Sequence, residues 1–421
     1  MAELHEPASL HAGAKKHDHG RKLRVMRLDG PPRLLARHDE VARESVGGEF
    51  NGGAVLGHTH LSARRPEVGF HPGSVGHQPA VVGDLYDRWM AATLFLDRRV
   101  PRGVLSQFLP GGAFRPLVDL ALEDRQVRDV QLRRQSWSSP ERGESYVSVY
   151  AGLSAVVSVN FNGRGVKVVT HGTYQGLDSF VPEWTKRQEV DRLASQIDQI
   201  VAFTRDTIAH VTMSGQFLNE GLVHAALAAA PAESEIRTPN REVSISFKST
   251  AARQQWMEPV ISRYQTCLAA LADPPPWWPS LTSLGTGCDF LAVDDDGRLL
   301  ALEAKPANAA TGIAKGPVQV ALYAELLRAW VDDVVDHVEI VGGMFDQRVQ
   351  LGLAPPGLLV VPSPTVVPVL AIGEGTASTE AMKRAFSVAS ALVPARRLGV
   401  APLEIWTLDS AGCAASKEII G

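Results

Sequence analysis

The chain lacks any hydrophobic run long enough to cross a membrane, because no stretch of about 18 apolar residues occurs in it. Its N-terminus has no apolar segment typical of a signal peptide. The three cysteines, Cys267, Cys288 and Cys413, are scattered, with neither a metal-ligand spacing nor a disulfide framework. These absences favour a cytoplasmic protein with no membrane partner.

An excess of basic charge is also missing, because the formal net charge is −4. Proteins that bind nucleic acid through their whole surface are commonly basic, so any such contact here must come from local patches or be transient. The motifs of several enzyme classes are absent as well. The sequence contains no Walker loop, no Gly-x-Ser-x-Gly elbow and no His-Glu-x-x-His helix.

The length of 421 residues predicts two domains and a tail. Residues 1–78 are rich in Gly, Arg, Pro and His and show no period of 2 or 3.6, which predicts a tail of low order. Nine of the thirteen histidines lie in this tail, among them His17, His19, His58 and His60. Histidine is a common metal ligand, but a solvated tail is the simpler interpretation, because no ordered scaffold would hold the ligands.

Residues 79–180 predict a small α+β or β-rich module, with a helix over 82–96 and strands over 146–150, 155–161 and 166–170. Arg125, Arg128, Arg133 and Arg134 gather beside these strands, interleaved with acids. The pattern indicates either a face that meets phosphates or a solvated charged surface. An amphipathic helix over 182–211 is predicted to connect this module, through residues 181–214, to the rest of the chain.

Residues 215–421 predict an α/β domain with a mixed sheet flanked by helices. The expected helices and strands, in chain order, are a helix over 216–230, a strand over 242–247, a helix over 253–271, a hairpin over 290–302, a helix from 318, strands over 357–361 and 366–372, a helix over 379–392 and a strand over 403–408.

The hairpin carries the residues with the clearest chemistry. Asp289 precedes an apolar strand, the Asp294–Gly297 segment is an Asp-Gly turn, and the second strand leads to Glu303 and Lys305. Residues two apart project from the same face of a strand. The pattern therefore predicts two carboxylates suited to a hard divalent cation, with an ammonium group beside them.

This stretch resembles the PD-(D/E)xK phosphodiesterase superfamily, the restriction-endonuclease-like nucleases. Asp289, Glu303-Ala304-Lys305 and Gln319 stand on the matching positions, while Cys288 stands where the motif's name has proline. The resemblance covers about the last half of the chain and implies a restriction-endonuclease-like core. It also implies a metal-dependent nuclease that acts on DNA, in restriction, phage defence or repair.

The resemblance further implies a site for Mg²⁺ or Mn²⁺, with Asp289, Glu303 and the backbone carbonyl of Ala304 as ligands. Glu220, on the predicted helix before the sheet, is a candidate further ligand, and plain solvent exposure is its alternative. Lys305 would orient or deprotonate the attacking water or offset negative charge, and the sequence does not choose among these roles. Gln319 would position water or a phosphate oxygen, and Tyr323 lies one turn further on the same helical face.

Two other interpretations stay open. A nuclease-like fold without activity would serve as a nucleic-acid-binding or interaction module, and a hairpin ending in two carboxylates also occurs as a solvated strand end. The sequence decides neither between DNA and RNA nor whether the chain forms a homo-oligomer.

Overall fold

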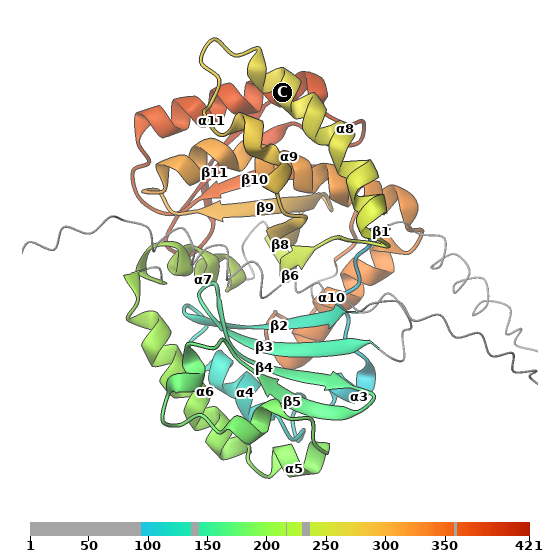
Figure 1. The fold of residues 1–421 in the computed structure, drawn as a ribbon, viewed down its shortest axis with the longest axis vertical. Coiled ribbons are helices and arrows are strands. Elements are labelled where there is room, and N and C mark those ends of the chain that lie inside the picture. The colour runs from blue at the N-terminus through green and yellow to red at the C-terminus, as the bar shows by residue number, and fades with distance from the viewer. Residues whose placement is uncertain (1–93, 136–142, 216, 230–235, 358–359) are drawn as a thin grey trace, which may run out of the picture. The chain divides into compact units, whose positions relative to one another are not determined.

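Two β-sheets organise the part of the chain that the computed structural model describes, which is residues 94–135, 143–215, 217–229, 236–357 and 360–421 (Figure 1). The predicted tail over 1–78 and most of the predicted helix over 82–96 lie outside the described residues. The end of that helix prediction is wrong, because Leu94–Phe95 forms a short strand, β1, that pairs antiparallel with β7, Ser246–Phe247. Residues 78–421 belong to one compact unit.

The first sheet is antiparallel, in the order β2-β3-β4-β5. Its strands are β2 (Arg128–Gln135), β3 (Glu144–Ala151), β4 (Ser154–Asn162) and β5 (Gly165–Val169). Strands β3, β4 and β5 confirm the predicted strands. Strand β2 was not predicted, because its charged and polar residues leave too few apolar positions to show a period of two. Alternate residues such as Val149 and Val159 form an apolar face with a continuous core.

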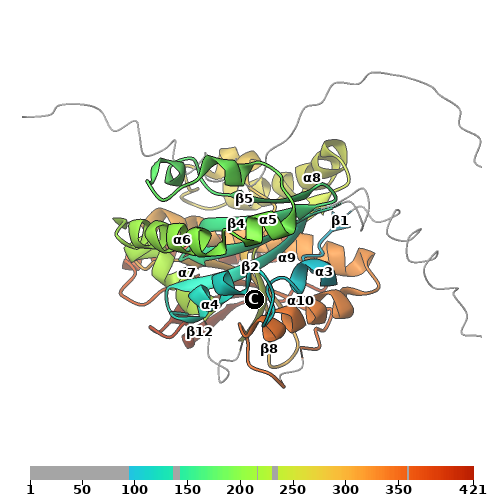
Figure 2. The same cartoon turned by 90° about the horizontal axis from the view of Figure 1, so that it is seen from below.

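Helices cover that apolar face. They are α3 (Arg102–Leu105), α4 (Arg115–Leu122), α5 (Val190–Ala194) and α6 (Ile197–Thr212), with short 3₁₀ turns at Tyr174–Gly176 and Pro182–Thr185. Figures 1 and 2 show α4 and α6 together on one side of the sheet, and their apolar residues share its core. The opposite face of the sheet is polar.

The predicted single helix over 182–211 is wrong in its first half. The chain around Gln188 runs extended instead, because its backbone exchanges hydrogen bonds with Val166 of β5, at 2.9 and 3.0 Å. Trp184 is fully buried and its Nε1 donates to the side-chain oxygen of Gln196 at 2.8 Å. These tertiary contacts outweigh the local helical period.

The second sheet has six strands in the order β12-β11-β10-β9-β8-β6. They are β6 (Ile236–Ser244), β8 (Gly287–Asp294), β9 (Leu299–Lys305), β10 (Val366–Ile372), β11 (Leu403–Leu408) and β12 (Ala414–Ile420). The strands β9, β10 and β11 are parallel, and the other neighbours are antiparallel. The predicted mixed sheet flanked by helices is confirmed at this level, and β12 is a strand that was not predicted.

Helices lie against both faces of this sheet. They are α7 (Leu222–Ala228), which follows a π-helical turn at Phe217–Gly221, α8 (Thr250–Ala269), α9 (Ala310–Asp333), α10 (His337–Leu351) and α11 (Thr379–Leu392), with 3₁₀ turns at Trp278–Ser283 and Val393–Ala395. The helices α8, α9 and α11 pack on one face, and α7 packs on the other. No helix among the described residues combines the length and the apolar character needed to cross a membrane.

Helix α9 begins earlier than predicted. The residues before the predicted start at 318, among them Gly312, Gly316 and Pro317, are part of the helix, which starts at Ala310. A side chain at Gly316 would place its Cβ 2.5 Å from Leu370 Cδ1, so the glycine is needed for the close passage of α9 over β10. The missing N–H of Pro317 costs one helical hydrogen bond, and burial of most of the helix offsets this loss.

Two further differences concern the segment between α9 and β10. Helix α10 was not predicted, and the residue that follows its last turn, Gly352, adopts the left-handed conformation with φ of 83°. The predicted strand over 357–361 is wrong for its described residues Gly357, Val360 and Val361, none of which is in a strand. Val360 instead belongs to the core beside α10, whereas Val361 is exposed.

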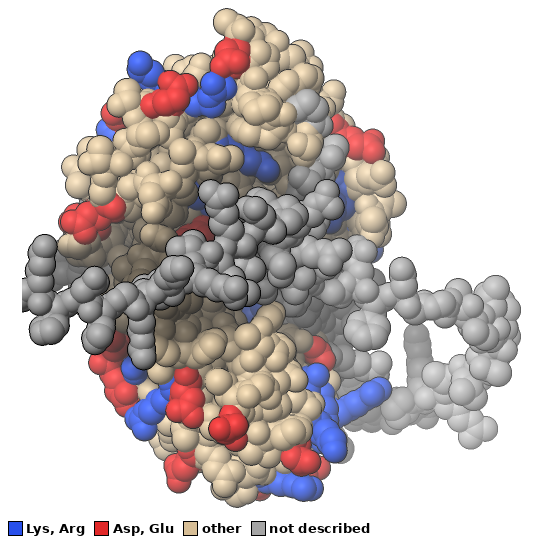
Figure 3. Space-filling model, turned by 60° about the vertical axis from the view of Figure 1, so that its left-hand side comes forward, with Lys and Arg blue, Asp and Glu red and all other residues tan. Residues whose placement is uncertain are grey.

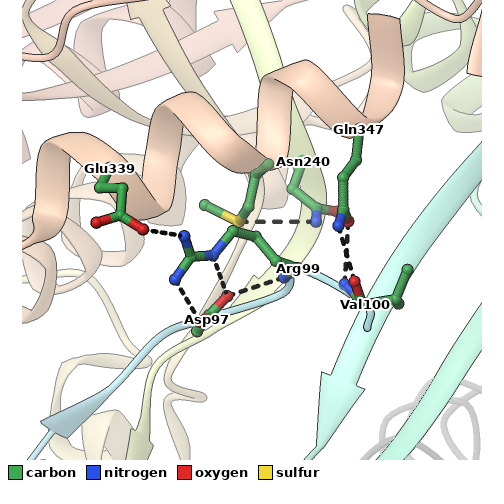
Figure 4. A network of polar contacts seen from close by, with 7 residues as sticks. Asp97, Arg99, Val100, Asn240, Glu339 and Gln347 are labelled. Atoms are coloured by element: carbon green, nitrogen blue, oxygen red, sulfur yellow. Dashed lines mark hydrogen bonds and ion pairs between the residues drawn. The ribbon is translucent and has the colours of Figure 1, made fainter. Parts of the chain in front are cut away.

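Helix α10 fastens the two sheets to each other. Two of its side chains bind the segment after β1 (Figure 4). Glu339 accepts a hydrogen bond from Arg99 at 3.0 Å. Gln347 accepts from the Val100 N–H at 3.0 Å and donates to the Val100 carbonyl at 2.8 Å. Its Arg348 forms a buried ion pair with Asp129 of β2 at 3.0 Å. The edges of β2 and β6 also meet directly, because the Asn240 side chain donates to the Leu132 carbonyl at 2.9 Å.

Candidate functional site

Three carboxylates lie at neighbouring positions on adjacent strands of the six-stranded sheet. On β6 and β8, Arg241 pairs with Phe290 and Val243 with Cys288, so Glu242 lies opposite Asp289. On β8 and β9, Phe290 pairs with Leu302, and continuing this register places Asp289 opposite Glu303. The structure therefore brings together the two acids predicted from the hairpin and adds Glu242, which the sequence did not indicate.

The side chain of Asp289 binds the backbone of β9 just beyond the last paired residues of the hairpin, Phe290 and Leu302. Its Oδ2 accepts a hydrogen bond from the backbone N–H of Ala304 at 2.9 Å and lies 3.5 Å from His224 Nε2. The side chain is 19% exposed, so solvent or a ligand can still reach it. The structure thus places the amide of Ala304 at Asp289, and a ligand role for the Ala304 carbonyl stays a prediction.

Lys305 is buried between acids. Its Nζ lies 2.8 Å from Glu303 Oε1 and 3.8 Å from Glu220 Oε1. Burial disfavours the charged amine, but Glu303 and Asp289 outweigh this effect and raise the pKa of Lys305. Lys305 is therefore an ammonium group at neutral pH in this arrangement, and it supplies positive charge rather than accepting a proton.

Glu220 is at the edge of this cluster. It lies in the π-helical turn that precedes α7, and its side chain is 33% exposed. Turns of this kind are frequent at functional sites. Its proximity to Lys305 places Glu220 next to the two predicted carboxylates rather than on a remote solvated surface.

Helix α9 brings two polar residues to the same place. Gln319 and Tyr323 are both buried and hydrogen-bonded to each other. Burial raises the pKa of Tyr323 well above its ordinary value, and the charges of Glu303 and Asp289 raise it further. The tyrosine is therefore a neutral hydroxyl close to the acids, able to donate or accept a hydrogen bond.

His224 of α7 is a site residue that the sequence did not assign, although its four-residue spacing from Glu220 places both on one helical face. It is 2% exposed, and its ring packs on Phe290 with centroids 5.4 Å apart. Neither ring nitrogen has a hydrogen-bond partner among the described residues. Burial lowers the pKa of His224 to about 4, so the imidazole is neutral and has a lone pair available for a metal ion.

Glu242 has a strained backbone. Its φ is 50°, and no other non-glycine residue in the described ranges has a positive φ. Such a conformation costs about 1–2 kcal/mol. Burial, with the charges of Asp289 and Glu303, raises the pKa of Glu242 to about 7. No local sequence signal reveals this strain, because glutamate has no preference for positive φ.

These residues fit a divalent cation. One donor atom from each of His224, Glu242 and Asp289 lies within 4.8 Å of the other two. The unsatisfied imidazole and two carboxylates form a mixed nitrogen and oxygen donor set, which suits Mn²⁺ or another transition ion better than Mg²⁺.

Comparisons of the chain with protein-family models, with curated proteins and with solved structures found no significant match.

Proposed function

We propose that the chain is a metal-dependent phosphodiester hydrolase that cleaves DNA, and that its six-stranded sheet is a restriction-endonuclease-like core. The observation that carries the proposal is the convergence of Asp289, Glu303 and Lys305 at one end of β8 and β9, with Glu242 and His224 beside them. Carboxylates and an ammonium group in a partly closed site provide what phosphodiester hydrolysis needs.

Asp289 and Glu242 would hold the cation, with His224 or Glu303 completing the set. When bound, a divalent cation neutralises charge on the phosphate and makes a bound water more acidic. The cluster holds more acidic than basic groups, and a cation would relieve the repulsion from Asp289 and Glu303, which adds to the effect of burial in raising the pKa of Glu242. The amide of Ala304 holds Asp289 in place for this task.

Lys305 would contact a non-bridging oxygen of the phosphate, where negative charge grows as water attacks phosphorus. Its protonated state suits this role and opposes the role of general base. In the reaction, the water oxygen bonds to phosphorus and the water releases one proton, while the ester P–O bond breaks and the leaving oxygen receives one proton. Gln319 and Tyr323 are placed to orient water by hydrogen bonds.

The experiment is to incubate the purified full chain with labelled single-stranded DNA, duplex DNA and RNA in EDTA, Mg²⁺ or Mn²⁺. Asp289→Asn should lower the cleavage rate on the order of 10²–10³-fold. Asp296→Asn is a matched control, because Asp296 is exposed at the other end of the same hairpin. Absence of cleavage with either metal, or equal rates for the two variants, would overturn the proposal.

Lys305 variants test the mechanism separately. Lys305→Ala should abolish cleavage, and Lys305→Arg should not restore it, because a planar guanidinium does not match the position of a point charge. Removing Lys305 also leaves Glu303 buried without its partner, so the melting temperature must be measured on the same preparations. A variant that is folded and cleaves at the normal rate would remove Lys305 from the mechanism and favour a purely structural ion pair.

A further inference from the structure

The four-stranded sheet has a row of polar side chains across the face opposite its helices, in which Arg133, Tyr146 and Lys167 are half-buried and Asn160 is buried. The register pairs Arg133 with Tyr146, Tyr146 with Asn160, and Asn160 with Lys167, so these four residues lie side by side on β2, β3, β4 and β5. We call them the polar row. Directly opposite residues share a face of a sheet, and the other face is the apolar one that packs on α4 and α6.

The acid beside this row is already neutralised. Glu144 accepts a hydrogen bond from Tyr146 at 2.5 Å and forms an ion pair with Arg187 at 2.8 Å. Arg187 also binds the carbonyls of Asn160 and Gly165, which fixes its position. The guanidinium of Arg133 lies over the ring of Tyr146 at 5.7 Å. The row is therefore organised, and basic groups outnumber acids on it.

The polar row leads toward the candidate site. Its first strand, β2, lies beside β6, since Gln131 donates to the carbonyl of Arg241 and Arg241 stacks over Tyr150 at 4.5 Å. The next residue along β6 is Glu242. The molecular surface is hollowed between the parts built on the two sheets, and acidic atoms are visible inside this hollow (Figure 3).

Arg98 lies where the row and the site meet. It is 6% exposed, and its Nη2 donates to the carbonyl of Ser244 at 3.2 Å. Arg98 therefore lies against β6, the strand that carries Glu242.

We propose that the polar row binds the phosphate backbone of DNA and directs the strand toward Glu242, Asp289 and Glu303. This inference rests on the proposed function. Arg133 and Lys167 are separated by three strand spacings, about 14 Å, which corresponds to the rise of about four base pairs along the axis of a DNA duplex, at about 3.4 Å each. Guanidinium and ammonium groups are the usual partners of phosphate oxygens. A solvated sheet face, common in antiparallel sheets, is the alternative.

The test is equilibrium binding of the full chain to a fluorescent 20-nucleotide DNA in EDTA, where no metal-dependent cleavage occurs. The double variant Arg133→Gln, Lys167→Gln is compared with the control Lys383→Gln, Arg396→Gln. The control removes one lysine and one arginine from exposed positions near α11, on the other sheet's outer helix layer. Melting temperatures of all three proteins establish that each is folded.

We expect the row variant to weaken binding about tenfold or more at low salt, and the slope of log K against log salt to fall by about 2. The control variant should bind like the wild type. Equal binding by both variants, or wild-type protein that does not bind DNA, would overturn the inference. Binding of RNA in preference to DNA would overturn the assignment of the partner.

Cleavage separates this inference from the proposed function. If the wild type cleaves DNA with Mn²⁺ and the row variant binds and cleaves equally well, the row is not the binding surface although the enzyme is a nuclease. If no protein cleaves but DNA binding depends on Arg133 and Lys167, the binding surface is supported and the hydrolase proposal fails. A folded row variant that binds weakly and recovers cleavage at high DNA concentration supports both.

Discussion

Glu242→Gln is expected to stabilise the metal-free protein at neutral and alkaline pH. The pKa of Glu242 is raised to about 7 in the folded chain from an ordinary value of 4.5. Folding therefore takes up a proton between these values, so the free energy of unfolding of the wild type falls as pH rises through this window. Glutamine has no charge to lose and escapes this fall.

The magnitude follows from the difference in pKa. A shift of this size corresponds to about 3 kcal/mol, and the partial exposure of the side chain reduces it to about 2 kcal/mol. For a folded unit of this size, the variant should melt about 3 °C above the wild type at pH 8. At pH 4.5 the two proteins should melt at nearly the same temperature.

The assay is thermal unfolding of the full chain in EDTA between pH 4.5 and pH 8.5, with the exposed Glu418→Gln as a control. Comparing Glu242→Gly with Glu242→Gln separates charge from backbone strain. Both variants lack the charge, and only glycine relieves the positive φ, which it does at every pH. A difference between wild type and Glu242→Gln that does not change with pH would refute the reasoning. Added Mn²⁺ should reverse the order of stability, since metal binding stabilises only the protein that has the ligand.

Two further predictions concern the rest of the chain. Arg348→Met should lower the free energy of unfolding by about 3–5 kcal/mol, because it leaves Asp129 buried without its partner. Urea unfolding measures this change, and a loss below about 1 kcal/mol would contradict a role for the ion pair in joining the two sheets. Deleting residues 1–78 should leave solubility and melting temperature unchanged, because their composition offers little apolar surface to bury. A large decrease in solubility or melting temperature would show that these residues stabilise the rest of the chain.

Some features could be predicted from sequence because local physics decides them. The strands β10 and β11 and the helix α11 have the predicted bounds. An uninterrupted apolar run suits a buried parallel strand, and Ser378 caps α11 by accepting a hydrogen bond from the Ala381 N–H at 3.1 Å. The proximity of Asp289, Glu303 and Lys305 also followed from a hairpin register that the sequence already indicated.

Other features depended on contacts between distant segments. The extended chain around Gln188 is set by β5, and Gly316 lies where α9 passes closely over β10. His224 joins the site because α7 packs on Phe290, and Glu242 adopts its positive φ where β6 meets both β2 and β8. Sequence periodicity records which face of an element is apolar, whereas burial of a histidine or strain at a glutamate depends on the neighbours that folding brings to it.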